Sequence, residues 1–173
     1  INTDSLFILP GFDKPLTLSE FDSMLLIAPE TELLPGNMFY YDHQATKGSH
    51  LPELFSFPCK GKVISHFGLR SGRMHTGTDI KMNKGDTIYA SFHGEVTRAR
   101  YYYGYGNMVA IDHGNNIATS YSHLSIILVS RGEIVKKGQP VGLAGSTGRA
   151  TTSHLHFEIR ENNKPFDPEL VFD

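Results

Sequence analysis

The sequence predicts a mainly β domain, and two features of its pattern support this class. Short runs rich in β-branched and aromatic residues recur after residue 55, and glycine-containing turns separate them. No segment there shows the 3.6-residue apolar period of a long amphipathic helix. Many short strands without long helices are typical of a sandwich or an open barrel. The predicted strands are 62–65, 87–90, 94–98, 107–111 and 117–121.

The turns between these strands are placed by glycine. Segments 84–86 and 137–139 each combine glycine with polar residues between apolar runs. The turn at 114–116, Gly-Asn-Asn, lies between two alternating runs, which is a strong hairpin pattern. We therefore expect strands 107–111 and 117–121 to pair antiparallel.

The chain of 173 residues has the size of one domain with a modest extension. The formal net charge of −2 and the scattered Lys and Arg residues give no basic stripe, which argues against a nucleic-acid partner. No apolar run approaches the length needed to span a bilayer, and 126–129 is far too short. The sequence begins with Ile1, as a processed product would, so the absence of an export signal excludes no compartment.

We divide the sequence into an irregular arm, 1–54, and a domain, 55–173. The arm is rich in proline and carries no chemical motif, although 19–28 fits a brief helix capped by Ser19. Cys59 is the only cysteine, which excludes an intrachain disulfide, and we expect it to be a buried core residue.

Residues 153–160 alternate polar side chains with Leu, Phe and Ile, as a half-buried strand does. Positions i and i+2 of a strand face the same side, so His154 and His156 should share a face with Glu158 and Arg160. Two imidazoles on one face suit a metal site with an added base, although two solvated histidines are an equally good interpretation of this pattern alone.

A second pattern, His-x-x-x-Asp, joins His75 to Asp79. An extended segment would place both side chains on one side, with Gly77 leaving space between them for a shared metal ion. A surface hydrogen bond between the two side chains explains the spacing equally well when it is taken alone.

Together the two patterns supply two histidines and a carboxylate, with a fourth position left for water. Such an open ligand set is typical of catalytic zinc, whereas structural zinc is closed by four protein ligands. Zinc acidifies its bound water and polarises a carbonyl, so hydrolysis also needs a group that moves the proton. His123, after a predicted strand, and His154 are suited to this, because histidine titrates near neutral pH.

Residues 58–168 resemble the lysostaphin-type or LytM-type zinc metallopeptidases. The resemblance implies that His75, Asp79 and His156 bind one Zn²⁺ per chain and that His123 and His154 form the catalytic pair. It rests on six stretches in the order and spacing of that family. They are 64–70, 75–79, 105–115, 121–124, 145–148 and 154–158.

The resemblance also implies a fold and a substrate. The family fold is an antiparallel β domain with a substrate groove, and we expect the glycine-rich loops 103–107 and 142–148 to be its walls. The implied substrates are cross-bridges or stem peptides of bacterial peptidoglycan. That substrate implies a periplasmic, envelope or secreted location.

The remaining histidines receive no catalytic role. Segments carrying His66, His93 and His113 lack metal roles in the family, so we expect these residues to be structural. His43 and His50 lie in the arm and are given no role. Since some relatives lay an upstream residue on the zinc, Asn37 is a candidate inhibitory residue.

Two rival functions remain open at this point. A non-catalytic adaptor that activates another wall hydrolase would be expected to have lost part of the residue set, which is complete here. A non-haem iron oxygenase also uses two histidines and a carboxylate, but it needs no additional histidine pair. The sequence therefore favours a zinc endopeptidase over both.

Overall fold

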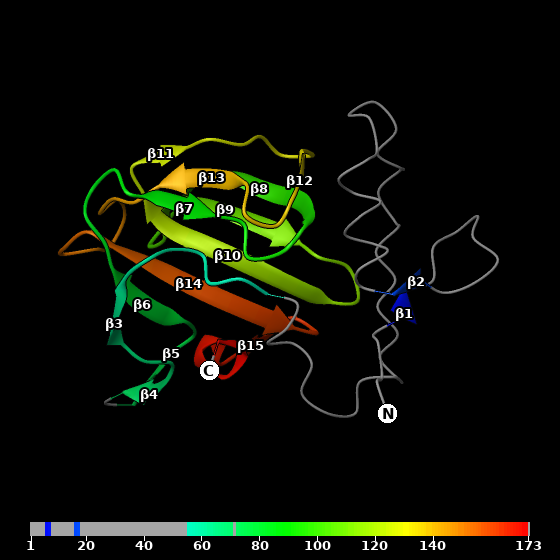
Figure 1. The fold of residues 1–173 in the computed structure, drawn as a ribbon. Helices are drawn as coiled ribbons and strands as arrows, with labels where there is room; N and C mark the ends of the chain where they lie inside the picture. Colours follow the sequence, from blue (N-terminus) through cyan, green and yellow to red (C-terminus); the bar gives the residue numbers. More distant parts are fainter. Residues whose placement is uncertain (1–5, 8–15, 18–54, 71, 173) are drawn as a thin grey trace.

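The computed structural model of the protein describes residues 6–7, 16–17, 55–70 and 72–172 (Figure 1). Two short strands, β1 (Leu6–Phe7) and β2 (Leu16–Thr17), pair antiparallel. The predicted helix at 19–28 lies outside the described residues, as do Asn37, His43 and His50. The predicted boundary between an arm and a domain at residue 54 stays a prediction.

The largest element is an eight-stranded sheet in which every hydrogen-bonded pair of strands is antiparallel. The strand order is β12-β8-β9-β10-β14-β6-β3, with β15 paired to β14. The mainly β antiparallel class predicted from the sequence is confirmed. The strands are β3 (Lys62–Ser65), β6 (Thr78–Lys81), β8 (Gly94–Tyr102), β9 (Gly106–Asp112), β10 (Ile117–Leu124), β12 (Ile134–Val135), β14 (His154–Glu161) and β15 (Lys164–Phe166).

A three-stranded antiparallel sheet lies over the large one in Figure 1, in the order β11-β13-β7. Its strands are β11 (Ile126–Ile127), β13 (Pro140–Leu143) and β7 (Thr87–Tyr89). Ile88 and Val141 of this sheet belong to the same buried cluster as Val109 and Leu155 of the large sheet. The two sheets therefore share one core, as in a sandwich.

A short hairpin and one helical turn complete the described fold. The hairpin pairs β4 (Gly68–Arg70) with β5 (Arg73–His75), and the 3₁₀ turn η1 (Pro168–Val171) follows β15. Asp167 caps this turn by accepting a hydrogen bond from the Glu169 amide. Within 55–70 and 72–172, no helix has the length and hydropathy needed to cross a membrane.

The predicted hairpin between β9 and β10 is confirmed. Gly114, Asn115 and Asn116 have φ values of 78°, 50° and 63°, the left-handed region that glycine and asparagine tolerate best. The Gly114 amide also donates to the Asp112 carboxylate at 2.9 Å. The turn thereby fixes the register of two strands that run on towards the candidate site.

The alternation predicted for β14 is also confirmed. Leu155, Phe157 and Ile159 are at most 2% exposed and contribute to the core. The opposite, polar face is more buried than the outer face of an ordinary surface strand, since Glu158 is 2% exposed and His156 7%.

Cys59 is buried as expected, and burial together with the Asp86 charge raises the pKa of its thiol to about 12.

Two of the histidines expected to be structural lie in the core. His113 donates from Nδ1 to the His93 carbonyl at 2.7 Å and accepts at Nε2 from the Thr119 hydroxyl at 2.8 Å. Burial lowers the pKa of His113 to about 4. Burial and the charges of His113 and Lys137 lower the pKa of His93 to about 3. Both rings are therefore neutral at neutral pH.

This pair predicts a loss of stability in mild acid. Below pH 6.5 the unfolded imidazoles bind protons while the folded ones stay neutral, so the free energy of unfolding falls as pH drops from 6.5 towards 4. For His113 the loss at pH 4 is about 3 kcal/mol. Urea unfolding of the parent and of His113→Gln at pH 7 and pH 4 measures it. The variant should show the shallower pH dependence, and equal slopes would contradict the assignment.

Candidate metal centre

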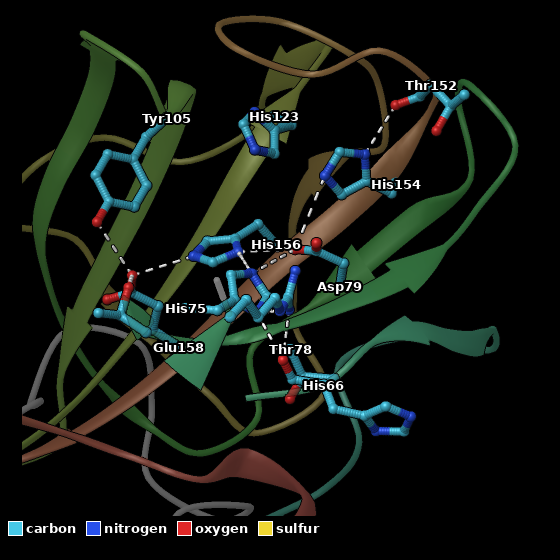
Figure 2. Close-up of polar contacts among 12 residues, drawn as sticks. His66, His75, Thr78, Asp79, Tyr105, His123, Thr152, His154, His156 and Glu158 are labelled. Carbon is cyan, nitrogen blue, oxygen red and sulfur yellow. Dashed lines mark hydrogen bonds and ion pairs between the residues drawn. The ribbon is translucent and has the colours of Figure 1, made fainter. Parts of the chain in front are cut away.

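The sheet register brings the three predicted metal ligands together. His156 of β14 pairs directly with Asp79 of β6, and His75 ends β5 just before β6 begins. Figure 2 shows the three side chains converging from these elements. Their side chains are partly buried, with exposed fractions of 16% for His75, 17% for Asp79 and 9% for His156.

The distances among the three ligand atoms fit a small divalent cation. His75 Nε2 lies 3.2 Å from Asp79 Oδ1 and 3.2 Å from His156 Nδ1, and His156 Nδ1 lies 2.8 Å from Asp79 Oδ1. Tetrahedral ligands about 2.0–2.1 Å from zinc lie about 3.3 Å apart. The described residues therefore offer a nearly formed face of a zinc tetrahedron, with two nitrogens and one oxygen.

Hydrogen bonds on the far side of each ring leave the inward nitrogens free for a metal. His75 donates from Nδ1 to the His66 carbonyl at 2.8 Å, and Arg70 donates to the same carbonyl. His156 Nε2 lies 3.1 Å from the Glu158 carboxylate. Such outer partners fix the tautomer and orientation of metal-binding histidines.

The charges around the cluster favour a cation. Burial alone would raise the pKa of Asp79, but the His156 hydrogen bond and the nearby histidines lower it to about 2. Burial would lower the pKa of His156, but hydrogen bonds to Asp79 and Glu158 raise it to about 9. The position between these two carboxylates thus stabilises positive charge, which a metal ion carries permanently.

The two predicted catalytic histidines lie beside this cluster. The ring centroids of His123 and His154 are 4.7 Å apart, and His154 Nε2 lies 3.9 Å from Asp79 Oδ1. His123 donates from Nδ1 to the Thr147 carbonyl at 2.7 Å, and His154 from Nδ1 to the Thr152 carbonyl at 2.8 Å. In the neutral form each ring therefore keeps an unprotonated Nε2.

The backbone at His123 is unusual. Its φ is +64°, uncommon for a residue other than glycine, and the β9–β10 register shifts between Tyr121 and Leu124. Its amide donates to the Tyr105 carbonyl at 2.8 Å. Bulges of this kind redirect a side chain, here at the strand end nearest the other histidines. Burial, with the nearby His154 and His156, lowers the pKa of His123.

Gly77 serves a different purpose from the one predicted. A Cβ there would lie 2.3 Å from the Phe157 carbonyl oxygen, 2.9 Å from Glu158 Cγ and 3.0 Å from His156 Cε1. The glycine therefore lets the segment between β5 and β6 pack directly against β14. It brings the predicted metal ligands together by close backbone approach, and β14 occupies the space on this side of Gly77.

The two glycine-rich loops lie against each other. Arg149 donates from its amide to the Gly104 carbonyl at 2.9 Å, and a Cβ on Gly148 would lie 2.3 Å from the Gly106 amide nitrogen. The strands also reach into both predicted loops, since β9 begins at Gly106 and β13 ends at Leu143. The glycines thus serve loop–loop packing, and the role of these loops as groove walls stays a prediction.

Sequence reasoning gave Glu158 no role, although it lies next to the predicted metal ligands. Its carboxylate contacts His156 and lies within hydrogen-bonding distance of Thr76, Tyr105 and Arg160. Burial would raise the pKa of Glu158, but its hydrogen bonds and the Arg160 charge lower it to about 2. The signal in the sequence was its i+2 spacing from His156, which places both residues on one face. His66 was also expected to be structural, and its exposed side chain lies with Nδ1 2.8 Å from a Glu169 carboxylate oxygen.

The antiparallel β domain holds two histidines and an aspartate at zinc spacing, and two further histidines lie beside them. These side chains are the kind that a metal-dependent hydrolase uses. The chain belongs to peptidase family M23, which residues 73–168 match. The predicted resemblance to the lysostaphin-type and LytM-type peptidases is confirmed by this match.

The chain is similar to proteins with two kinds of described activity. It is 38% identical to the peptidoglycan DD-endopeptidase ShyA of Vibrio cholerae over 133 residues, which are 73% of this chain and 31% of ShyA. It is 40% identical to the murein hydrolase activator NlpD of Salmonella typhimurium over 113 residues, which are 65% of this chain and 29% of NlpD. The chain thus spans less than a third of the length of either relative.

A solved structure shares the fold. The crystal structure of a zinc-containing peptidase from Vibrio cholerae superposes with a TM-score of 0.63 at 35% sequence identity. The match covers 69% of this chain and 40% of that one. The match therefore leaves more than half of the other protein unmatched.

Proposed function

We propose that the chain is a zinc-dependent endopeptidase that hydrolyses peptide bonds in the peptide part of bacterial peptidoglycan. The observation that carries this proposal is the spacing of His75, Asp79 and His156, whose ligand atoms lie within 4.8 Å of one another. Relatives described as acting on peptidoglycan support the substrate class. That substrate in turn supports a location in the cell envelope, the periplasm or outside the cell.

In the proposed mechanism His75, Asp79 and His156 hold zinc, and His123 and His154 move protons. Bound zinc would supply a Lewis acid that acidifies water and polarises the scissile carbonyl. Each catalytic histidine is anchored through Nδ1 to a backbone carbonyl, which leaves Nε2 to accept a proton from the attacking water. The resulting imidazolium can stabilise the developing oxyanion and return the proton to the leaving amine.

A second candidate function is a non-catalytic adaptor that activates another wall hydrolase. The similarity to the murein hydrolase activator NlpD favours it. Three observations support the enzyme instead: the spacing of the three proposed ligand side chains, the Nδ1 anchor of His123 and the Nδ1 anchor of His154. In the neutral rings these anchors leave Nε2 unprotonated. An adaptor has no need of a formed metal cluster or of aligned proton carriers.

Digestion of purified sacculi distinguishes the two functions. The purified full chain is incubated with sacculi, with zinc or after chelation, and the released fragments are identified by mass spectrometry. We expect zinc-dependent release of peptides, and the description of ShyA favours cleavage of DD cross-links over glycine bridges. Zinc binding without any release would support the adaptor. Bound iron with oxygen uptake would contradict the zinc peptidase.

A further inference from the structure

Glu158 is a buried ionisable group that the proposed mechanism leaves unused. Its side chain is 2% exposed, and an isolated buried carboxylate would be strongly unfavourable. Four hydrogen-bond donors satisfy it. They are Thr76 Oγ1 at 2.6 Å, Tyr105 Oη at 3.1 Å, His156 Nε2 at 3.1 Å and Arg160 Nε at 3.0 Å.

These donors come from three separate parts of the fold. Thr76 lies between β5 and β6, immediately after His75, and Tyr105 lies in the turn between β8 and β9. His156 and Arg160 lie with Glu158 on one face of β14. Figure 2 shows the Glu158 carboxylate between Tyr105 and His156. A single carboxylate therefore ties the segment after one ligand to the strand that carries another.

The contact with His156 bears directly on metal binding. A neutral imidazole has one protonated nitrogen and one with a free lone pair, and only the latter binds a metal. The Glu158 carboxylate is the acceptor in all four of its contacts, so in the neutral ring that binds a metal the proton of His156 lies on Nε2. Nδ1, which lies 2.8 Å from Asp79 Oδ1 and 3.2 Å from His75 Nε2, is then the free nitrogen.

We propose that Glu158 is a positioning residue that fixes the tautomer and ring orientation of His156 for metal binding. The inference rests on the proposed ligand role of His156. Glu158 acts through His156, and its contacts with Thr76 and Tyr105 hold the carboxylate in place. Outer partners of this kind contribute about 10–100-fold to metal affinity.

The test compares Glu158→Leu with the parent full chain. The zinc dissociation constant is measured by competition with a chromophoric chelator, and the His156 Nε2–H proton of the zinc-loaded protein is followed by NMR. We expect Glu158→Leu to weaken zinc binding about 10–100-fold. We also expect it to move the Nε2–H resonance upfield and to speed its exchange with water. Unchanged affinity with an unchanged resonance would overturn the proposal.

Two further variants keep the test decisive. If Glu158→Leu does not fold, Glu158→Gln decides, because an amide oxygen is a weaker acceptor than a carboxylate. It should shift the Nε2–H resonance upfield and weaken zinc binding a few-fold, and a parental resonance with parental affinity would refute the proposal.

Tyr105→Phe removes a different donor to the same carboxylate and should keep zinc affinity within about threefold. A loss as large as that of Glu158→Leu would assign the effect to the whole cluster and overturn the specific role.

Failure of this inference and failure of the proposed function give different results. If the parent binds zinc but releases no peptide from sacculi, the endopeptidase proposal fails while the role of Glu158 is still tested by affinity. If the parent cleaves and Glu158→Leu binds zinc as the parent does, only the positioning role is lost.

Discussion

Replacing His75 with alanine is expected to weaken zinc binding about 100-fold and to remove most peptidoglycan cleavage. The variant leaves Asp79 and His156 as the remaining ligands, with the space of the imidazole open to water. A four-ligand zinc site is worth about 10–16 kcal/mol, so one ligand contributes roughly 3 kcal/mol, or about 100-fold in affinity. Chelator competition measures the zinc dissociation constant, and mass spectrometry of fragments from sacculi measures cleavage.

His66→Ala is the matched control for this variant. The His66 side chain is exposed and contacts Glu169, whereas only its backbone carbonyl reaches His75. The substitution keeps that carbonyl, so zinc affinity and cleavage should stay near the parent values. Parental zinc affinity in His75→Ala would show that the metal binds elsewhere, and the ligand assignment would be wrong.

The local parts of the fold and site were predictable from the sequence. The alternation in β14 separates core from polar side chains within eight residues, and the strand keeps that alternation in the structure. The Gly114–Asn116 turn is likewise encoded locally, by residue types that tolerate positive φ. Strand pairing could not be derived this way, because the His156–Asp79 register joins residues 77 positions apart. The ligand assignment came from the family resemblance.

Features that depend on distant contacts were missed. From the sequence alone, Glu158 was only one polar residue on the polar face of a strand. Its partners Thr76 and Tyr105 lie 82 and 53 positions away in the sequence. The purpose of Gly77 was misassigned for the same reason, because the backbone that it approaches belongs to β14. Composition and spacing contain no information on which distant strand will lie against a given residue.

The proposed catalytic pair, His123 and His154, gives the second large expected effect. His123→Ala and His154→Ala should each bind zinc within about threefold of the parent and cleave peptidoglycan about 10²–10⁴-fold more slowly. Zinc is retained because neither ring belongs to the ligand triad. The fold is retained because β10 and β14 are held by backbone pairing, which both substitutions leave intact. Zinc content by mass spectrometry and initial rates on sacculi provide the two measurements.

The double variant shows whether the two histidines act in one step. Their ring centroids lie 4.7 Å apart, and in the neutral form each ring directs an unprotonated Nε2 away from the carbonyl that anchors it. Residues that act as a unit give strongly non-additive losses, so the double variant should be scarcely slower than the slower single variant. Multiplied losses would instead indicate independent roles. A parental cleavage rate in His123→Ala would remove that residue from the mechanism and leave His154 as the sole proton carrier.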